Sequence, residues 1–135
     1  MDTGPMVAYL DPDDPAHAPV AAVLTDFRGT LHTTGAVLTE AMHLLARARN
    51  GPSALADFIA YSDMHVHDAC QPPRVTSAAL LMDRYADRPM DFADATLVLL
   101  AQRLDVHEVL TLDRRGFHTY RTADGRPFRP VLDQP

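Results

Sequence analysis

The stretch Pro89-Met-Asp-Phe-Ala-Asp-Ala-Thr-Leu-Val-Leu-Leu-Ala101 begins with two carboxylates and continues as a strongly apolar segment. Its pattern predicts a helix over residues 92–104, with Asp91 and Asp94 on neighbouring parts of one face. Asp94 falls within the apolar arc of that helix, formed by Leu97, Val98, Ala101 and Leu104. A carboxylate on a buried arc is costly unless a partner such as a metal ion pairs with it.

Two interpretations of these acids stay open on this stretch alone. Asp91 suits the N-cap of the helix, and Asp94 has the spacing of its third-position capping partner. Capping accounts well for Asp91, but it does not require Asp94 to lie on the buried arc. A metal-ligand role accounts for the placement of Asp94.

Length and composition predict one soluble domain over residues 1–135. The chain is long enough for a hydrophobic core, and 47% of its residues are hydrophobic. No apolar run approaches the roughly 18 residues of a membrane span, and the N-terminus is wrong for a signal peptide. The single cysteine, Cys70, permits no internal disulfide. We therefore expect a cytoplasmic protein that does not enter a membrane.

The formal net charge of −6 argues against tight, non-specific binding of polyanions. All 12 basic residues are arginine, and only two of the 18 acidic residues are glutamate. A divalent-metal site concentrates acids at one point, and arginines elsewhere can still contact phosphates bidentately. The charge balance is therefore compatible with a nuclease.

Extended and helical patterns alternate along most of the chain. Strands are expected over residues 30–34, 64–69 and 109–112, with an edge strand over 128–132, and residues 117–121 are expected to be irregular. Helices are expected over residues 6–10, 18–25, 36–50, 54–62 and 74–86, in addition to 92–104. This alternation predicts an α/β fold with a parallel sheet covered by helices on both faces.

In such sheets, functional residues gather at the carboxyl ends of the strands. Asp113 directly follows the strand expected over residues 109–112, and Glu40 lies a few residues beyond the strand over 30–34. Asp94 is at the start of a helix. The placement of these three residues suggests one acidic pocket.

Four stretches then occur in order: Asp2-Thr-Gly-Pro, Thr39-Glu40-Ala-Met-His-Leu-Leu, Phe92-Ala-Asp94-Ala, and Leu110-Thr-Leu-Asp113-Arg-Arg-Gly-Phe117. Together they resemble the PIN-domain family, and most closely its VapC-type ribonuclease toxins. The resemblance covers nearly the whole chain. It implies a three-layer α/β/α sandwich around a short, mainly parallel central sheet. It also implies a ribonuclease that depends on Mg²⁺ or Mn²⁺, that commonly forms a homodimer, and that a cognate antitoxin neutralises.

The family's four acids correspond to Asp2, Glu40, Asp94 and Asp113, and Asp91 matches a frequent additional acid. These five residues are the expected metal ligands, and the first four are the expected catalytic residues. Hard divalent ions prefer oxygen ligands, and water that they activate can cleave a phosphodiester. Arg114 and Arg115 are possible RNA contacts, and Thr111 is a possible minor site residue.

The chain departs from the family pattern at two places. A strand of roughly five apolar residues usually precedes the first aspartate in the family, whereas here only Met1 precedes Asp2. The N-terminal strand therefore looks truncated, and we expect the true start codon to lie upstream. An acid often precedes the phenylalanine of the last motif, but Gly116 stands there, which is expected to lower the metal affinity.

The segment His65-Val-His67-Asp68, with Cys70 nearby, has the residue types of a metal site. In a strand, His65 and His67 share one face. No second Cys/His pair at zinc spacing follows, so the expectation is that these histidines are structural or solvated.

The leading hypothesis is therefore a metal-dependent endoribonuclease toxin that acts on RNA. The alternative is a catalytically weak module that holds RNA or an antitoxin without cleavage, motivated by the short N-terminus and Gly116. The sequence leaves open the target RNA, the antitoxin and the oligomeric state.

Overall fold

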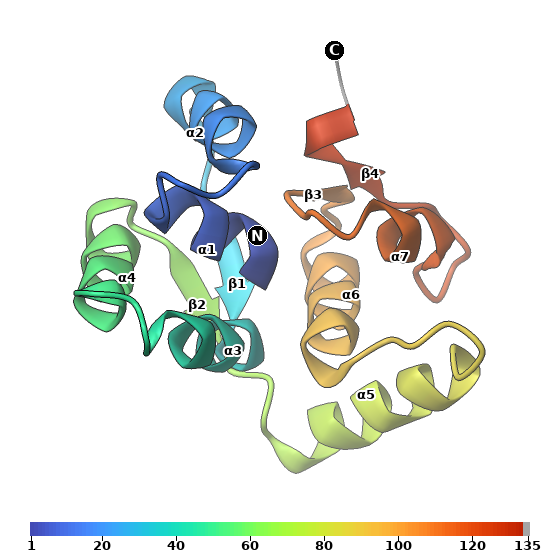
Figure 1. Ribbon diagram of the computed structural model, residues 1–135. Coiled ribbons are helices and arrows are strands. Elements are labelled where there is room, and N and C mark those ends of the chain that lie inside the picture. Colours follow the sequence, from blue (N-terminus) through green and yellow to red (C-terminus); the bar gives the residue numbers. More distant parts are fainter. Residues whose placement is uncertain (134–135) are drawn as a thin grey trace.

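The computed structural model describes residues 1–133, which contain short parallel strands surrounded by helices (Figure 1). The helices are α1 (Thr3–Leu10), α2 (His17–Asp26), α3 (Gly35–Leu45), α4 (Gly51–Tyr61), α5 (Pro72–Arg84), α6 (Phe92–Leu104), α7 (Arg114–Thr119) and the 3-10 turn η1 (Val131–Asp133). The strands are β1 (His32–Thr34), β2 (His65–His67), β3 (Glu108–Val109) and β4 (Arg129–Pro130). The predicted fold class, an α/β fold with parallel strand pairing, is confirmed.

The strands form two small parallel sheets rather than one continuous sheet. β1 pairs with β2, so that His32 lies opposite His65 and Thr34 lies opposite His67. β3 pairs with β4 through a register of two residues. Each pair joins segments far apart in the sequence, with at least one helix between them, as parallel pairing requires.

The first two residues connect these sheets through backbone hydrogen bonds. The Met1 amino group donates to the His32 carbonyl over 2.7 Å, and the Asp2 amide donates to the Leu110 carbonyl over 2.9 Å. The Thr33 hydroxyl also donates to the Met1 carbonyl over 2.9 Å. Met1 and Asp2 thus lie between the chain at β1 and the chain that follows β3, and Asp2 is held there by its main chain.

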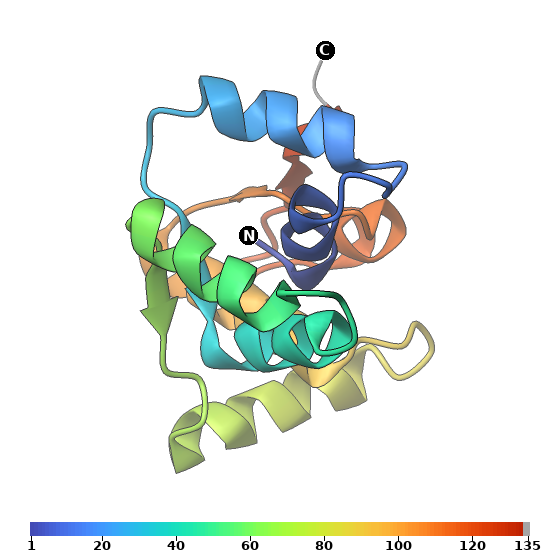
Figure 2. The same ribbon diagram turned by 60° about the vertical axis from the view of Figure 1, so that its left-hand side comes forward.

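Helix α6 is the centre of the packing, in keeping with its apolar sequence. Both α3 and α5 pack against it, together with β1 (Figure 2). It begins with the predicted capping box and ends at Leu104, and the φ of 54° at Asp105 takes the chain out of the helix. The core that surrounds it is closely packed, and the large residues that are at most 1% exposed include Met6, Val37, Val98, Phe117 and Tyr120.

Two helix boundaries differ from the prediction for local reasons. The helix predicted over residues 36–50 ends at Leu45, and α4 begins at Gly51. Gly51 lies so close to the Leu45 carbonyl that a Cβ there would be 2.2 Å from its oxygen, which explains the glycine. Pro72 and Pro73 begin α5 rather than preceding it, because proline is tolerated in a first helical turn.

The C-terminal third differs more. The prediction that residues 117–121 are irregular was wrong, because α7 covers Arg114–Thr119 with Asp113 as its N-cap. The strand predicted over residues 109–112 is reduced to β3, and the edge strand predicted over 128–132 is reduced to β4 followed by η1. The chain after β3 instead contacts Asp2, through Leu110 and Thr111.

Two leucines are exposed on helix surfaces: Leu44 on α3 is 54% exposed, and Leu80 on α5 is 65% exposed. The core of the described residues contains neither of them. Within residues 1–133, none of the helices has both the length and the apolar character needed to cross a membrane.

Candidate functional site

Asp2 is a buried carboxylate held by two donors. Its side chain is the N-cap of α1, where one oxygen accepts the Thr3 amide over 2.7 Å. The other oxygen accepts the Thr111 hydroxyl over 2.6 Å. Asp2 is only 8% exposed, and burial raises the pKa of its carboxyl despite both hydrogen bonds.

Thr111 connects Asp2 to Asp113. While its hydroxyl donates to Asp2, the same oxygen accepts the Asp113 amide over 3.0 Å. The Asp113 carboxylate is then fixed by the Gly116 amide, which donates to it over 3.0 Å at the start of α7. Because Thr111 is fully buried, this link fixes the positions of two of the predicted acids.

Asp94 and Asp91 form the capping box that the sequence allowed. The Asp94 amide donates to the Asp91 carboxylate over 2.8 Å, and the Asp91 amide approaches the Asp94 carboxylate at 3.4 Å. Asp94 is nevertheless only 9% exposed, whereas Asp91 is exposed. Asp94 therefore takes part in the capping box and also places its carboxylate on the buried arc of the helix.

Tyr120 is a further residue of the site, and the sequence pattern did not predict it. This residue is 1% exposed, and its hydroxyl donates to the Asp94 carboxylate at 3.4 Å. Burial, followed by the charges of Asp94 and Asp113, raises the pKa of the phenol. Its place in the sequence, at the end of a segment expected to be irregular, gave no signal of this contact.

The acids repel one another across this part of the molecule. Burial, followed by the charges of Asp91, Asp2 and Asp113, raises the pKa of Asp94 from its ordinary value of 3.8 to about 7. A carboxyl with this pKa is only partly ionised at neutral pH in the absence of a cation. The structure thus places four predicted ligands within electrostatic range of one another.

Glu40 joins the site from the side. The Glu40 carboxylate accepts the Thr3 hydroxyl over 2.7 Å. Because Thr3 directly follows Asp2, this contact brings Glu40 close to Asp2. Glu40 and Asp91 also line the same open groove, together with Ala36, Thr39, His43, Cys70, Phe92 and Ala93. The Glu40 side chain is half-buried.

The donor set fits a hard divalent cation. Asp91, Asp94 and Glu40 each keep one carboxylate oxygen outside the hydrogen bonds formed among the described residues. The acids are spread rather than tightly gathered, since no three of them within residues 1–133 offer oxygens within 4.8 Å of one another. Mg²⁺ commonly takes one or two carboxylates directly and completes its shell with water, which suits such a set.

The two arginines differ in their surroundings. Arg114 forms an ion pair with Asp133 over 2.8 Å, which directs it toward η1. Arg115 is exposed, and no ion pair to it is formed by residues 1–133. His118 also contacts Asp133, over 2.7 Å.

Comparison with known proteins agrees with this class of fold, an α/β domain with short parallel strands. The family model for the PIN domain matches residues 1–123. Ribonuclease VapC26 of Mycobacterium tuberculosis (strain ATCC 25618 / H37Rv) is 30% identical over 133 residues, covering 97% of this chain and 98% of its own. The crystal structure of M. tuberculosis VapC20, described as a sarcin–ricin loop cleaving toxin, superimposes with a TM-score of 0.75. That likeness has 19% identity, covers 83% of this chain and 87% of VapC20, and concerns the fold.

The chain therefore belongs to the PIN-domain family. Within that family it is a homologue of the VapC ribonuclease toxins.

Proposed function

We propose that this chain is a metal-dependent endoribonuclease, the toxin of a toxin–antitoxin pair, with Mg²⁺ or Mn²⁺ as its cofactor. The observation that carries the proposal is the set of mutually repelling acids around Asp94, whose pKa is raised to about 7. Such a set is unfavourable without a cation and becomes favourable with one. Its presence in a PIN-domain homologue of VapC toxins supports phosphodiester hydrolysis.

The residues proposed to hold the ion are Asp2, Glu40, Asp91, Asp94 and Asp113. When bound, a divalent ion supplies Lewis-acid activation of water and neutralises charge that develops on the phosphate. The other side chains keep the acids in place. Thr111 orients Asp2 and Asp113, Thr3 orients Glu40, and the Tyr120 hydroxyl reaches Asp94. Because these partners are buried or half-buried, the acids have few alternative positions.

RNA is the proposed substrate, and Arg115 is the better candidate for contact with its phosphates. Its guanidinium extends from the first turn of α7, two residues from Asp113, and it is exposed. Arg114 would first have to leave Asp133. An arginine at this distance along the chain from the acids can fix the register of the backbone without reading bases.

The decisive experiment is cleavage of a panel of structured RNAs with Mn²⁺ or Mg²⁺. The panel includes a sarcin–ricin loop hairpin, because the structural relative VapC20 is described as cleaving that loop. The wild type is compared with Asp94→Asn and with Asp57→Asn, which replaces an exposed aspartate on α4. We expect metal-dependent cuts that Asp94→Asn loses and Asp57→Asn keeps. Equal cutting by all three proteins would place the activity elsewhere.

A binding module without cleavage is the second candidate, and Gly116 favours it, because the family often has an acid at that position. Titration with Mn²⁺ separates the two functions. A nuclease should bind Mn²⁺ in a manner that Asp94→Asn weakens, whereas a binding module should retain partner binding in that variant.

A cognate antitoxin and a homodimer are also proposed. The exposed Leu44 and Leu80 are apolar side chains on the surface of α3 and α5 that a protein partner could cover. Light scattering of wild type, Leu44→Ser and Leu80→Ser at several concentrations tests the dimer. A mass equal to that of the monomer for all three proteins at high concentration would exclude it.

A further inference from the structure

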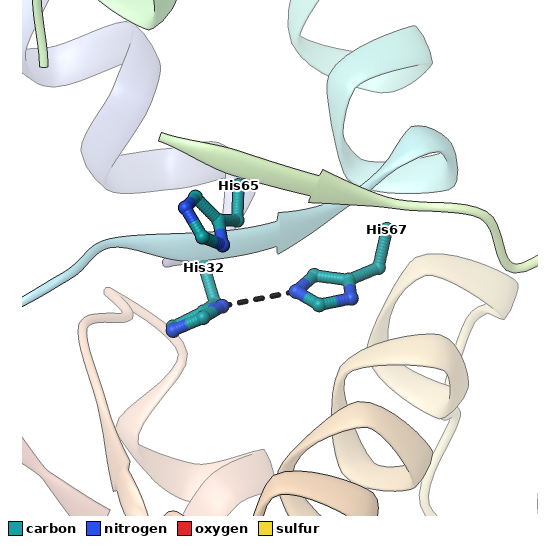
Figure 3. A group of neighbouring side chains, drawn as sticks. All are labelled: His32, His65 and His67. Carbon is teal, nitrogen blue, oxygen red and sulfur yellow. Dashed lines mark hydrogen bonds between the residues drawn. The ribbon is translucent and has the colours of Figure 1, made fainter. Parts of the chain in front are cut away.

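Three histidines outside the acidic site converge on one face of the β1–β2 sheet (Figure 3). His65 and His67 are two residues apart on β2, so their side chains leave the strand on the same side. The parallel register places His32 of β1 directly opposite His65. One ring nitrogen from each residue lies within 4.8 Å of those of the other two.

We propose that His32, His65 and His67 form a binding site for a divalent transition-metal ion, with Zn²⁺ as the expected ion. Imidazole nitrogen is a borderline ligand that suits Zn²⁺ and its neighbours in the first transition series. Three histidines with a fourth position open to water are a recurrent Zn²⁺ set. His65 is exposed and the other two are half-buried, so solvent can reach the open position.

The distances already approach those of a loaded site. Nδ1 of His32 and Nε2 of His67 are 2.9 Å apart and share a hydrogen bond. Two nitrogens on a tetrahedral Zn²⁺ at about 2.0–2.1 Å are roughly 3.3 Å from each other. Small rotations of the two rings would therefore exchange the shared proton for an ion. The third ring is near, since the His32 and His65 centroids are 5.1 Å apart.

The triad is distinct from the acidic site in residues and in chemistry. No residue is common to the two sets, and the triad offers nitrogen where the acids offer oxygen. Hard ions such as Mg²⁺ favour the oxygen ligands, whereas Zn²⁺ accepts nitrogen readily. The two sites should therefore take different ions from the same solution. The proposal for the triad does not depend on the nuclease activity.

One neighbouring residue opposes metal binding. A guanidinium nitrogen of Arg103 on α6 lies 3.3 Å from Nδ1 of His67. That contact requires an unprotonated Nδ1, whereas a neutral ring that binds an ion through Nε2 carries its proton on Nδ1. Arg103 must therefore move away when the ion binds, and its positive charge adds repulsion. Its exposed position makes that movement sterically easy.

The sequence pattern indicates only part of this site, because the third ligand comes from a different strand. It pairs His65 with His67, and the missing second Cys/His pair at zinc spacing argues against zinc there. The register of β1 against β2 provides His32 instead, 33 positions away in the sequence. A pairing of this kind is set by tertiary structure and leaves no local spacing to find.

The test uses the untagged 135-residue chain after removal of metals, because a histidine tag would bind the same ions. Zn²⁺ binding is measured calorimetrically, and Co²⁺ serves as a spectroscopic probe of tetrahedral coordination, both with excess Mg²⁺ present to occupy oxygen sites. The variants are His65→Ala, Arg103→Gln and the control His43→Ala, which removes an exposed histidine on α3. Circular dichroism verifies that each variant folds.

We expect one equivalent of Zn²⁺ to bind to the wild type and to His43→Ala with equal affinity. His65→Ala should bind at least about tenfold more weakly, because one ligand of three is gone. Arg103→Gln should bind more tightly than the wild type, because it removes the competing donor and its charge. Absence of Zn²⁺ binding by the folded wild type would overturn the proposal, as would equal binding by wild type and His65→Ala.

Discussion

The acidic site and the histidine triad differ in depth, in spacing and in donor atom. Asp2 and Asp94 are buried and carry raised pKa values, whereas His65 is exposed and the triad is at the surface of a sheet. The acids are spread over several helix N-termini, while the three rings lie within 4.8 Å. Two sets of potential ligands on one small fold are thus built by different means, one by helix capping and one by strand register.

The largest expected difference between the two regions concerns stability in the absence of metal. Because the pKa of Asp94 is raised from 3.8 to about 7, the folded protein binds this proton more tightly than the unfolded chain. The contribution of Asp94 to stability is thus most favourable below about pH 4 and becomes less favourable as the pH rises to about 7. Three pH units correspond to at most about 4 kcal/mol.

The measurement is the free energy of unfolding of wild type minus that of Asp94→Asn between pH 4 and pH 8, in chelator. Taking this difference removes the contribution of the other carboxylates, such as Asp105 and Asp124, whose pKa values are lowered by Arg126 and Thr122. We expect the wild type to lose stability relative to the variant as the pH rises. A difference that stays constant with pH would mean that Asp94 is not under the predicted repulsion.

The second prediction separates the regions by function. Asp94→Asn should lower Mn²⁺-dependent RNA cleavage by at least about a hundredfold and leave Zn²⁺ binding to the triad unchanged. His65→Ala should do the reverse, losing Zn²⁺ affinity while cleavage with Mn²⁺ stays at the wild-type rate. Both properties are measured on the same protein preparations. Loss of both properties in either variant would show that the two sites are not independent.

The sequence predicted the proximity of these acids better than it predicted the arrangement of the strands. Asp91 and Asp94 are three residues apart on one helix, so their relationship could be inferred from helical periodicity. The α/β alternation likewise predicted parallel pairing. The family resemblance then added Asp2, Glu40 and Asp113. In the structure all of these except Glu40 are N-caps or capping partners, a role that the sequence suggested only for Asp91 and Asp94.

The contacts that the sequence did not indicate join distant segments of the chain. Tyr120 reaches Asp94 across 26 residues, and Thr111 reaches Asp2 across 109. The division of the sheet into two parts also depends on the position of Met1 and Asp2 between them. No local pattern encodes such contacts. Helix periodicity is a property of consecutive residues, whereas these hydrogen bonds are set by how the core closes.

The third prediction concerns Gly116, which replaces an acid of the family pattern and here adjoins Asp113. A Cβ on Gly116 would be 2.1 Å from Oδ2 of Asp113 and 2.9 Å from the Tyr120 hydroxyl. Because the carboxylate is the end of a side chain, it can move without disrupting the core. Gly116→Ala should therefore lower Mn²⁺-dependent cleavage by roughly tenfold, close to the effect of moving a ligand, with little change in melting temperature.

A second variant at this position tests whether the missing acid matters. Gly116→Asp adds a carboxylate at the position where the family often has one, but it also displaces Asp113 in the same way. If Gly116→Asp is more active than Gly116→Ala, the additional acid contributes to metal binding. If the two are equally impaired, the displacement of Asp113 dominates. Zn²⁺ binding by the triad should be unaffected in both variants.

The smallest expected effect is that of Tyr120→Phe, which removes the hydroxyl but keeps the buried ring between Phe117 and Tyr85. The hydrogen bond to Asp94 is long, at 3.4 Å, so its loss should cost no more than about 1 kcal/mol of stability. Because this hydrogen bond is weak, its loss should also weaken Mn²⁺ binding or cleavage only a few-fold. The rates are measured at saturating and at limiting Mn²⁺. A large loss of cleavage rate at both Mn²⁺ concentrations would instead place the Tyr120 hydroxyl among the groups that act directly on the RNA. The active site would then include this buried hydroxyl in addition to the carboxylates.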